Sequence, residues 1–408
     1  MIETTHIHGW KVYHYQKKDA PDIVSIRLLF PNYNNDRQIG LSHLYNRLLL
    51  TQIQEASDRF IIGGDIAIGT DYTHRLISID TLQEDFSDFF ALIRTSIATF
   101  EVSDEELEQE KLLIKQEKHQ ERSQSKILLD ALGQEKFFGC HHPFRYDVEG
   151  SVHSIDGFSP QDLKAPNLVQ HGIIITVSAQ GIAEVSSQLD SLLPKQAASN
   201  GVVLPPPQTE WGSYLMPYEQ QEQAHLLYLR RTLPNTHPLY DAMQLGLMSL
   251  TSMFNSRLNQ KLRKHEGLTY GVQSYHRSMS DFGYLSISLS VDKNRVAEAR
   301  AYTQEILGSC TENWTFSELD IAKKIMLRTS LQCQTTCARI ADHIEARILR
   351  NQEPWYREDW TTQIRNIALS EVKEAMRLFS SSPVLDLCTG ASEGFSSSFR
   401  TTFPQKYQ

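Results

Sequence analysis

The chain has 408 residues, of which 40% are hydrophobic and 22% charged, a balance typical of a folded protein with a large core. This length exceeds the usual size of one domain and predicts two domains of about 200 residues each. The excess of 49 Asp and Glu over 40 Lys and Arg gives a formal net charge of −9, which disfavours binding to a nucleic-acid backbone. Neither a membrane-spanning stretch nor a signal peptide is recognisable, so we expect a cytoplasmic protein with no nucleic-acid or membrane partner.

The five cysteines are few, odd in number and far apart in the sequence, a pattern typical of a reducing compartment and not of a disulfide framework. We therefore expect free thiols.

Hydrophobic periodicity predicts strands and helices that follow one another in a similar order in both halves of the chain. In the first half we expect strands at 10–16, 23–30, 65–69, 74–81 and 173–177, and helices at 39–56, 86–97 and 103–122. In the second half we expect strands at 224–230, 270–276, 283–291 and 384–388, and helices at 238–254, 295–309 and two later stretches. Ser103 and Glu106 have the spacing of a capping box at the start of the long charged helix.

The two halves are separated by a segment, 197–212, that contains Pro205, Pro206 and Pro207 and has no helical or strand period. The sequence therefore predicts an N-terminal domain at 1–196, a proline-rich linker at 197–212 and a C-terminal domain at 213–408. The expected fold class is α+β, with two similarly folded domains, each a β-sheet covered on one face by helices.

Several common catalytic signatures are absent, including the phosphate-binding loop, the dinucleotide fingerprint and the hydrolase nucleophile elbow. Cys333 and Cys337, with His343 further along, have a spacing that could face a metal ion, but structural zinc sites usually need a second pair of ligands. We interpret the two cysteines as small core residues, and the adjacent His141 and His142 as part of a loop.

The helix that starts near Gly40 contains His43, Asn46 and Arg47. His43 and Arg47 lie four residues apart and therefore share one face of the helix. This helix resembles the zinc-site helix of the pitrilysin/insulysin and mitochondrial processing peptidase family, in which an inverted motif, H-x-x-E-H, supplies two zinc ligands and a general base. The resemblance assigns the third ligand position of the family to Glu117, with Glu110 seven residues before it.

Two of these five positions no longer suit a zinc peptidase. Arg47 replaces the second histidine, and a guanidinium both removes a ligand and repels the metal ion. Asn46 replaces the general base, and an amide cannot take a proton from water. We therefore expect no metal and no activity in this chain alone, and we expect Arg47 to pair with Glu117, since an inherited carboxylate would otherwise be buried without a partner.

The second half contains the most specific motif, in which Arg263 and Tyr270 lie seven residues apart around Gly267 and Leu268. In the family that the chain resembles, this Arg and Tyr reach the zinc site, bind substrate and stabilise the developing oxyanion. Both side chains are hydrogen-bond donors of the kind that this role requires. Without the resemblance, Arg263 would be interpreted as a helix-end residue and Tyr270 as a packed strand residue.

Together, the lost zinc half and the retained Arg/Tyr half resemble the non-zinc subunit of a bacterial two-chain member of the family. The resemblance implies a homologous zinc-binding peptidase subunit as partner, zinc in that partner and no cofactor in this chain, and a peptide substrate, with leader-peptide removal as one task. Arg263 and Tyr270 would then act in trans. The alternative is a catalytically inert scaffold of the same family, like the core proteins of respiratory complexes.

Overall fold

The computed structural model describes residues 2–32, 39–57, 64–163, 172–193, 204–218, 223–355, 360–390, 400–402 and 404. The chain forms two compact units of similar construction. The first unit consists of residues 1–119, 146–204 and 331–355, and the second of residues 120–145, 205–330 and 356–408. Each unit therefore includes a helical segment from the half of the sequence that builds mainly the other.

The first unit is built on a six-stranded sheet with the order β1-β2-β6-β3-β5-β4. Neighbouring strands are antiparallel except for the parallel pair β2 and β6. Its strands are β1 (Ile2–Ile7), β2 (Trp10–Gln16), β3 (Ile23–Pro31), β4 (Gly64–Thr70), β5 (His74–Leu82) and β6 (Ile173–Ser178). Its helices are α1 (Leu41–Ser57), α2 (Phe86–Ala98), most of α3 (Asp104–Arg122), α5 (Val152–Asp156), α6 (Pro160–Leu163), α7 (Ile182–Leu192) and α11 (Cys337–Ile348).

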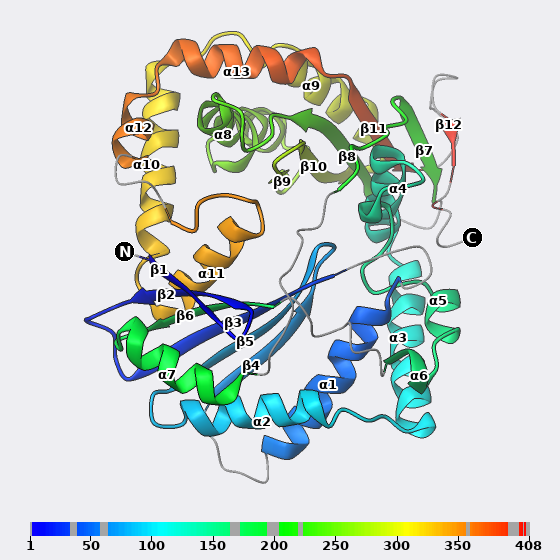
Figure 1. Cartoon of the computed structure of the whole chain (residues 1–408). Coiled ribbons are helices and arrows are strands. Elements are labelled where there is room, and N and C mark those ends of the chain that lie inside the picture. Colours follow the sequence, from blue (N-terminus) through cyan, green and yellow to red (C-terminus); the bar gives the residue numbers. More distant parts are fainter. Residues whose placement is uncertain are drawn as a thin grey trace. The chain divides into compact units, whose positions relative to one another are not determined.

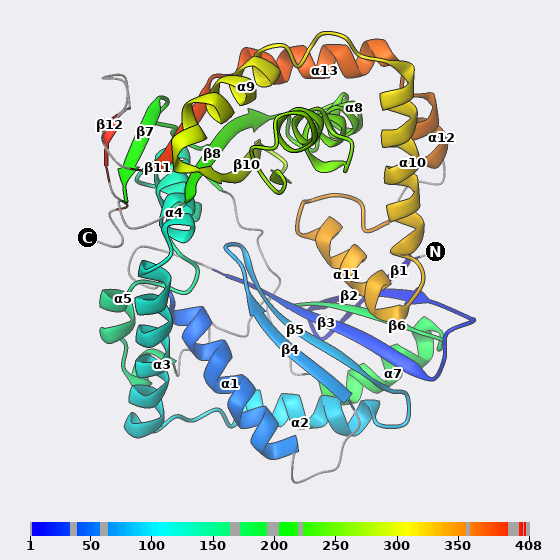
Figure 2. The ribbon, with the colours of Figure 1, turned by 180° about the vertical axis from the view of Figure 1, so that it is seen from behind.

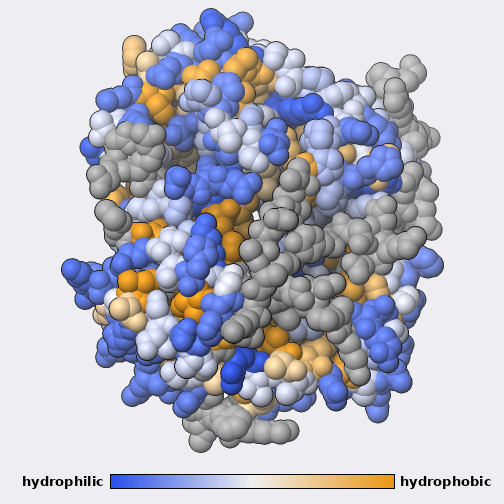
Figure 3. All heavy atoms as spheres, in the orientation of Figure 1, coloured by the Kyte–Doolittle hydropathy of each residue, from blue (hydrophilic) through white to orange (hydrophobic). Residues whose placement is uncertain are grey.

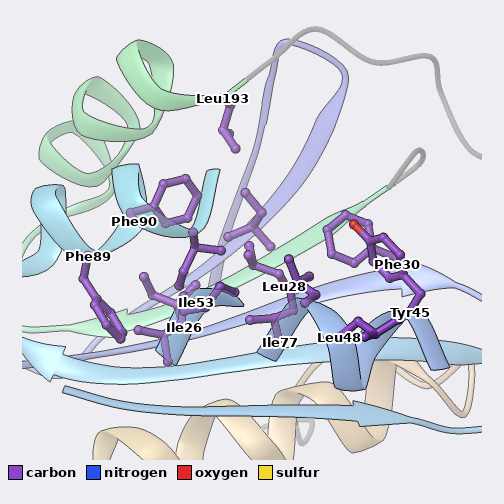
Figure 4. Close-up of a cluster of buried hydrophobic side chains, with 14 of the residues drawn as sticks. Ile26, Leu28, Phe30, Tyr45, Leu48, Ile53, Ile77, Phe89, Phe90 and Leu193 are labelled. Carbon is purple, nitrogen blue, oxygen red and sulfur yellow. The ribbon is translucent and has the colours of Figure 1, made fainter. Parts of the chain in front are cut away.

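The core of this unit lies between one face of the sheet and helices α1, α2 and α7 (Figure 1). Alternate strand residues such as Ile26, Leu28 and Phe30 point to this side, and they meet helix residues such as Tyr45 and Phe89 (Figure 4). The strand period of two and the helical period of 3.6 both direct apolar residues to the same interface. This burial fixes the position of α1, which carries His43, Asn46 and Arg47.

The second unit repeats the plan with a sheet of order β12-β7-β11-β8-β10-β9. Its strands are β7 (Ser213–Pro217), β8 (Gln223–Thr232), β9 (Gln273–Ser278), β10 (Gly283–Asp292), β11 (Val384–Gly390) and β12 (Arg400–Thr401). Its helices are α4 (Ser125–Phe138), α8 (Tyr240–Leu247), α9 (Val296–Gly308), most of α10 (Phe316–Gln332), α12 (Trp360–Asn366) and α13 (Leu369–Ser381), with π-helical turns η3 (Met248–Ser252) and η4 (Asn259–His265) and short 3-10 turns η1 (Pro143–Arg145) and η5 (Lys293–Arg295). The order and relative directions of the strands β7-β11-β8-β10-β9 are the same as those of β2-β6-β3-β5-β4 in the first unit. The predicted α+β class with two similar helix-covered sheets is therefore confirmed.

The second face of each sheet carries one helix from a distant part of the sequence. In the first unit, α11 packs on the face of β3 and β6 opposite α1 and α2 (Figures 1 and 2), where Cys337, Ile340 and Ile344 join an apolar cluster. In the second unit, α4 packs in the same way on β8 and β11. Part of the predicted linker, 204–212, has no regular secondary structure and hydrogen-bonds to the end of α4, where the Gln208 amide donates to the Phe138 carbonyl. The rest of the linker, 197–203, lies outside the described residues, and the predicted boundaries at 1–196 and 213–408 remain a prediction.

Most of the predicted elements coincide with observed ones within two residues, and the capping box at Ser103 and Glu106 is present. One difference bears on function: the predicted strand at 270–276 begins only at Gln273, so Tyr270 precedes it. The five cysteines are free. Within the described ranges, no helix is both long enough and apolar enough to cross a membrane. The face of the molecule drawn in Figure 3 is mainly hydrophilic, with scattered apolar areas.

Candidate functional site

The predicted zinc-site residues meet at the start of α1, where a close backbone approach fixes the geometry. Gly40 has a φ of +89°, and a side chain there would come within 2.8 Å of the Glu149 carbonyl oxygen and the Ile155 side chain. A residue without a Cβ is therefore required at this position. The approach brings the segment that contains Asp147 and Glu149 beside the first turn of α1, and together they line a cavity of about 230 Å³.

Asn46, at the position of the general base, is held against the edge strand β4. Its side-chain amide donates to the Gly69 carbonyl at 2.9 Å and to the Thr70 hydroxyl at 2.8 Å, and its oxygen accepts from Arg75 at 3.4 Å. Only 4% of the residue is exposed. Asn46 therefore has a structural role at the sheet edge, and its amide has no means of activating water.

Arg47, at the position of the second zinc histidine, bridges both carboxylates of α3. Its Nη1 lies 2.7 Å from Glu117 Oε2, and its Nε donates to Glu110 Oε1. Burial lowers the pKa of Arg47, but the hydrogen bonds and negative charges of Glu117 and Glu110 outweigh it and raise the pKa above the ordinary value. The predicted pairing of Arg47 with Glu117 is confirmed, and Glu110 is a second partner.

His43 retains the position of the first zinc ligand. Burial is the main cause that lowers its pKa, and the positive charges of Arg47 and Lys118 lower it further, against the opposing effect of Glu149. Its Nε2 is buried and has no hydrogen-bond partner among the described residues.

Lys118 is a site residue that the sequence analysis did not identify. It is 3% exposed, and its ammonium group lies 2.8 Å from Asp147 Oδ2 and 2.6 Å from Glu149 Oε2. Burial opposes the charged form, but the two carboxylates raise the pKa of Lys118 well above its ordinary value. The only available signal was an alternation of Lys and Glu along a charged helix, which more often marks a solvent-exposed face.

This donor set does not fit the zinc ion that the resemblance implies. A catalytic zinc needs three protein ligands and an open position, but only His43 and Glu117 remain, and the Glu117 carboxylate is bonded to a guanidinium. A zinc ion here would have to displace Arg47 and then lie beside its permanent positive charge. The site is an ion-paired polar cluster that can hold α1 against α3.

Of the alternative metal ligands named from the sequence, Cys337 is a core residue, whereas Cys333 is only partly buried and the interpretation of it as a core residue is wrong. Cys337 is 4% exposed in the apolar cluster under α11, and burial raises its pKa. His343 packs edge-on against Trp355, and burial lowers its pKa to about 4. In the part of the chain that is described, these two residues and Cys333 do not gather into a metal-binding group.

Arg263 and Tyr270 both lie on the surface of the second unit. Arg263 is exposed in the last turn of η4, with its guanidinium 5.2 Å from the ring centre of Phe254, and Tyr270 is 92% exposed in the segment before β9. The described residues give neither the guanidinium nor the phenol a hydrogen-bond partner. The interpretation of Tyr270 as a packed strand residue is therefore wrong, and its hydroxyl can donate to a ligand.

Two structurally repeated units, and an Arg47 ion pair with both carboxylates at the position where the resemblance places zinc, define the class of fold and site. Comparison with known proteins agrees with this class. Residues 174–326 match the family described as the peptidase M16 inactive domain. The chain is 26% identical over 305 residues, covering 70% of this chain and 72% of the relative, to a Bacillus subtilis protein named uncharacterized zinc protease YmxG.

Solved structures show the same fold. A peptidase M16 inactive domain protein from Pseudomonas fluorescens superposes with a TM-score of 0.85 at 19% identity, covering 98% of this chain and 99% of that one. A chain of complex III from Candida albicans superposes with a TM-score of 0.78 at 12% identity, covering 98% of both. The match of residues 174–326 and the similarity to the Bacillus subtilis relative support the resemblance to the M16 peptidase family stated from the motifs, and the solved structures support its fold.

Proposed function

We propose that this chain is the non-zinc subunit of a heterodimeric zinc peptidase and that Arg263 and Tyr270 act in trans at the zinc site of a homologous partner. The substrate is a peptide, with leader-peptide removal as one task, and the complex is cytoplasmic. Zinc belongs to the partner. The observation that carries the proposal is the contrast between the two predicted site halves, since Arg47 is tied to Glu110 and Glu117 while Arg263 and Tyr270 remain open to solvent.

The chemistry of the exposed pair suits the cleavage of a peptide bond. When water adds to a peptide carbonyl, negative charge develops on the carbonyl oxygen, and positioned donors stabilise it; zinc held by the partner would supply the activation of the water. A tyrosine hydroxyl supplies one donor and a guanidinium several. A tyrosine with 92% exposure also loses apolar contact with its own chain, which favours a role in binding another molecule.

The experiment is a reconstitution with an M16 homologue from the same organism that retains an intact H-x-x-E-H motif. We expect a stable one-to-one complex on size-exclusion chromatography, and peptide cleavage by the complex but by neither chain alone. Elemental analysis should then find one zinc ion per complex, lost when the partner's motif is changed. A complex that forms but leaves the partner's activity unchanged would contradict the proposal.

The alternative function is an inert scaffold within a larger assembly. The ion pairs of Arg47 favour the scaffold function, because they can stabilise the fold without taking part in catalysis. A scaffold, however, gives no reason for unpaired Arg263 and Tyr270 side chains at the surface. Changing these side chains distinguishes the two functions. The peptidase-subunit function predicts altered cleavage, whereas the scaffold function predicts an effect on assembly alone.

A further inference from the structure

A groove lined by both polar and apolar residues lies next to Tyr270 on the second sheet, against which α4 packs. The groove is a cavity of about 410 Å³ within the second unit, and its lining includes His225, Leu227, Tyr270, Gln273, Ser288 and Ser290. Its volume falls within the range of about 300–1,000 Å³ that is typical of ligand pockets.

The groove lies beside the N-terminal part of α4, which supplies Lys126, Leu129 and Asp130 to its lining. Further along α4, Gly133 lies so close to the sheet that an added Cβ would meet Leu227 at 2.6 Å and Leu229 at 3.0 Å. Lys126 and Leu129, near the start of α4, line the groove together with residues of β8 and β10. A strand face that no helix covers would expose apolar side chains, unless the residues on that face are polar.

The sequence of β10 provides such a polar face. Ser286, Ser288 and Ser290 alternate with the buried Ile287 and Leu289, so one face of the strand is a row of hydroxyl groups. The register places Ser290 opposite His225 and Ser288 opposite Leu227. The row of hydroxyl groups therefore borders the groove.

The donors and acceptors of the groove are uncharged or balanced. His225 Nδ1 and Ser290 Oγ lie 2.9 Å apart, and burial, followed by the charge of Lys126, lowers the pKa of His225, so its ring is neutral at pH 7. No described residue hydrogen-bonds to Nε2 of His225. The charged lining residues in the described part of the chain are Lys126 and Asp130, of opposite sign, and Lys126 donates to the Gln273 side chain at 2.6 Å.

We propose that this groove binds a segment of the substrate peptide and selects polar, uncharged side chains over apolar or charged ones. The inference rests on the proposed function for the identity of the ligand as substrate. A neutral row of hydroxyl, amide and imidazole groups matches the hydrogen-bonding groups of Ser, Thr, Asn and Gln. An apolar side chain would leave these groups desolvated without partners, and such a loss is unfavourable. With Tyr270 on its rim, the groove lies beside the residue that would contact the reacting carbonyl.

The test uses the full chain alone and three fluorescently labelled decapeptide mixtures, randomised over Ser/Thr/Asn/Gln, over Leu/Val/Ile and over Glu/Lys. Fluorescence anisotropy should show at least tenfold tighter binding of the first mixture. Ser288→Leu and Ser290→Leu place a bulky apolar group in the groove and should each weaken this binding about tenfold. Ser286→Leu is the matched control, because Ser286 lies on the same strand face but does not line the groove.

A second readout does not depend on any variant folding. In the wild-type chain with ¹³C-labelled histidine, the His225 ring signal should shift on addition of the Ser/Thr/Asn/Gln mixture, and the signals of histidines outside the groove should not. Equal binding of the apolar mixture, an equal loss of affinity in Ser286→Leu, or an unmoved His225 signal would each overturn the inference. Because no zinc subunit is present, failure here is distinct from failure of the proposed function, which is measured by cleavage in the reconstituted pair.

Discussion

Replacing Arg47 with Met should release the ion-paired cluster between α1 and α3. The Arg47 side chain is 27% exposed, that of Glu110 12% and that of Glu117 48%. The two ion pairs are therefore intermediate between fully exposed and fully buried pairs. Breaking a buried pair costs about 3–5 kcal/mol, whereas surface pairs contribute about 0–1 kcal/mol. We expect Arg47→Met to lower the free energy of local opening by about 2 kcal/mol, since two carboxylates then lose their shared partner.

Amide hydrogen exchange followed by mass spectrometry measures this opening directly, without assuming that both units unfold together. A loss of about 2 kcal/mol corresponds to about 30-fold faster exchange in α1 and α3. Adding Glu110→Gln to Arg47→Met should restore about 1 kcal/mol by removing carboxylate repulsion. Arg377→Met breaks an exposed ion pair with Glu374 and is the matched control. It should change the amide exchange rate around that pair by less than twofold. Exchange in α1 and α3 that Arg47→Met leaves within twofold of wild type would refute the reasoning.

Two further predictions concern the same unit. The double change Asn46→Glu and Arg47→His rebuilds the inverted motif and frees Glu117, so the variant should bind one zinc ion by elemental analysis; the same zinc content as wild type would contradict this. Burial, followed by a nearby carboxylate, raises the pKa of Glu345 to about 7 from 4.5, so the folded state binds this proton more tightly and the free energy of unfolding falls as pH rises from about 4.5 to about 7. Glu345→Gln should therefore match wild type at pH 4 and be up to about 3 kcal/mol more stable at pH 8, as measured by urea unfolding followed through tryptophan fluorescence. Equal stability of the variant and wild type at pH 8 would show that burial does not raise the pKa of Glu345.

The regular elements of this protein were predictable because its strands and helices have strong, separate hydrophobic periods. The strand at Trp10–Gln16 and the start of the strand at Ile23 were placed at the observed residues. The strand Ile2–Ile7 was missed because its exposed residues outnumber its buried ones at this sheet edge, which weakens the alternation. Tyr270 was assigned to a strand because tyrosine favours strands, but residues 267–272 form no helix or strand and β9 begins at Gln273.

At the candidate site, the motif spacing was sufficient to predict that Arg47 pairs with Glu117, because both positions derive from one ligand set. It could not reveal that Lys118 binds Asp147 and Glu149, since that contact depends on how the segment after α4 folds back on α3. The same limit hid the packing of α11 on the first sheet, which joins residues more than 300 positions apart. Long-range packing of this kind has no local sequence signal.

The central claim is tested most directly by the cleavage rate of the reconstituted pair that contains Tyr270→Phe. This change removes one hydroxyl donor and leaves the ring, so the complex should form with wild-type affinity while turnover falls about 10²–10³-fold. Arg263→Ala should also weaken substrate binding, and Tyr275→Phe, at another exposed tyrosine, should stay within about threefold of wild type. If Tyr270→Phe and Arg263→Ala both retain turnover within about threefold in an intact complex, the pair does not act on the partner's zinc site and the scaffold function is the better account.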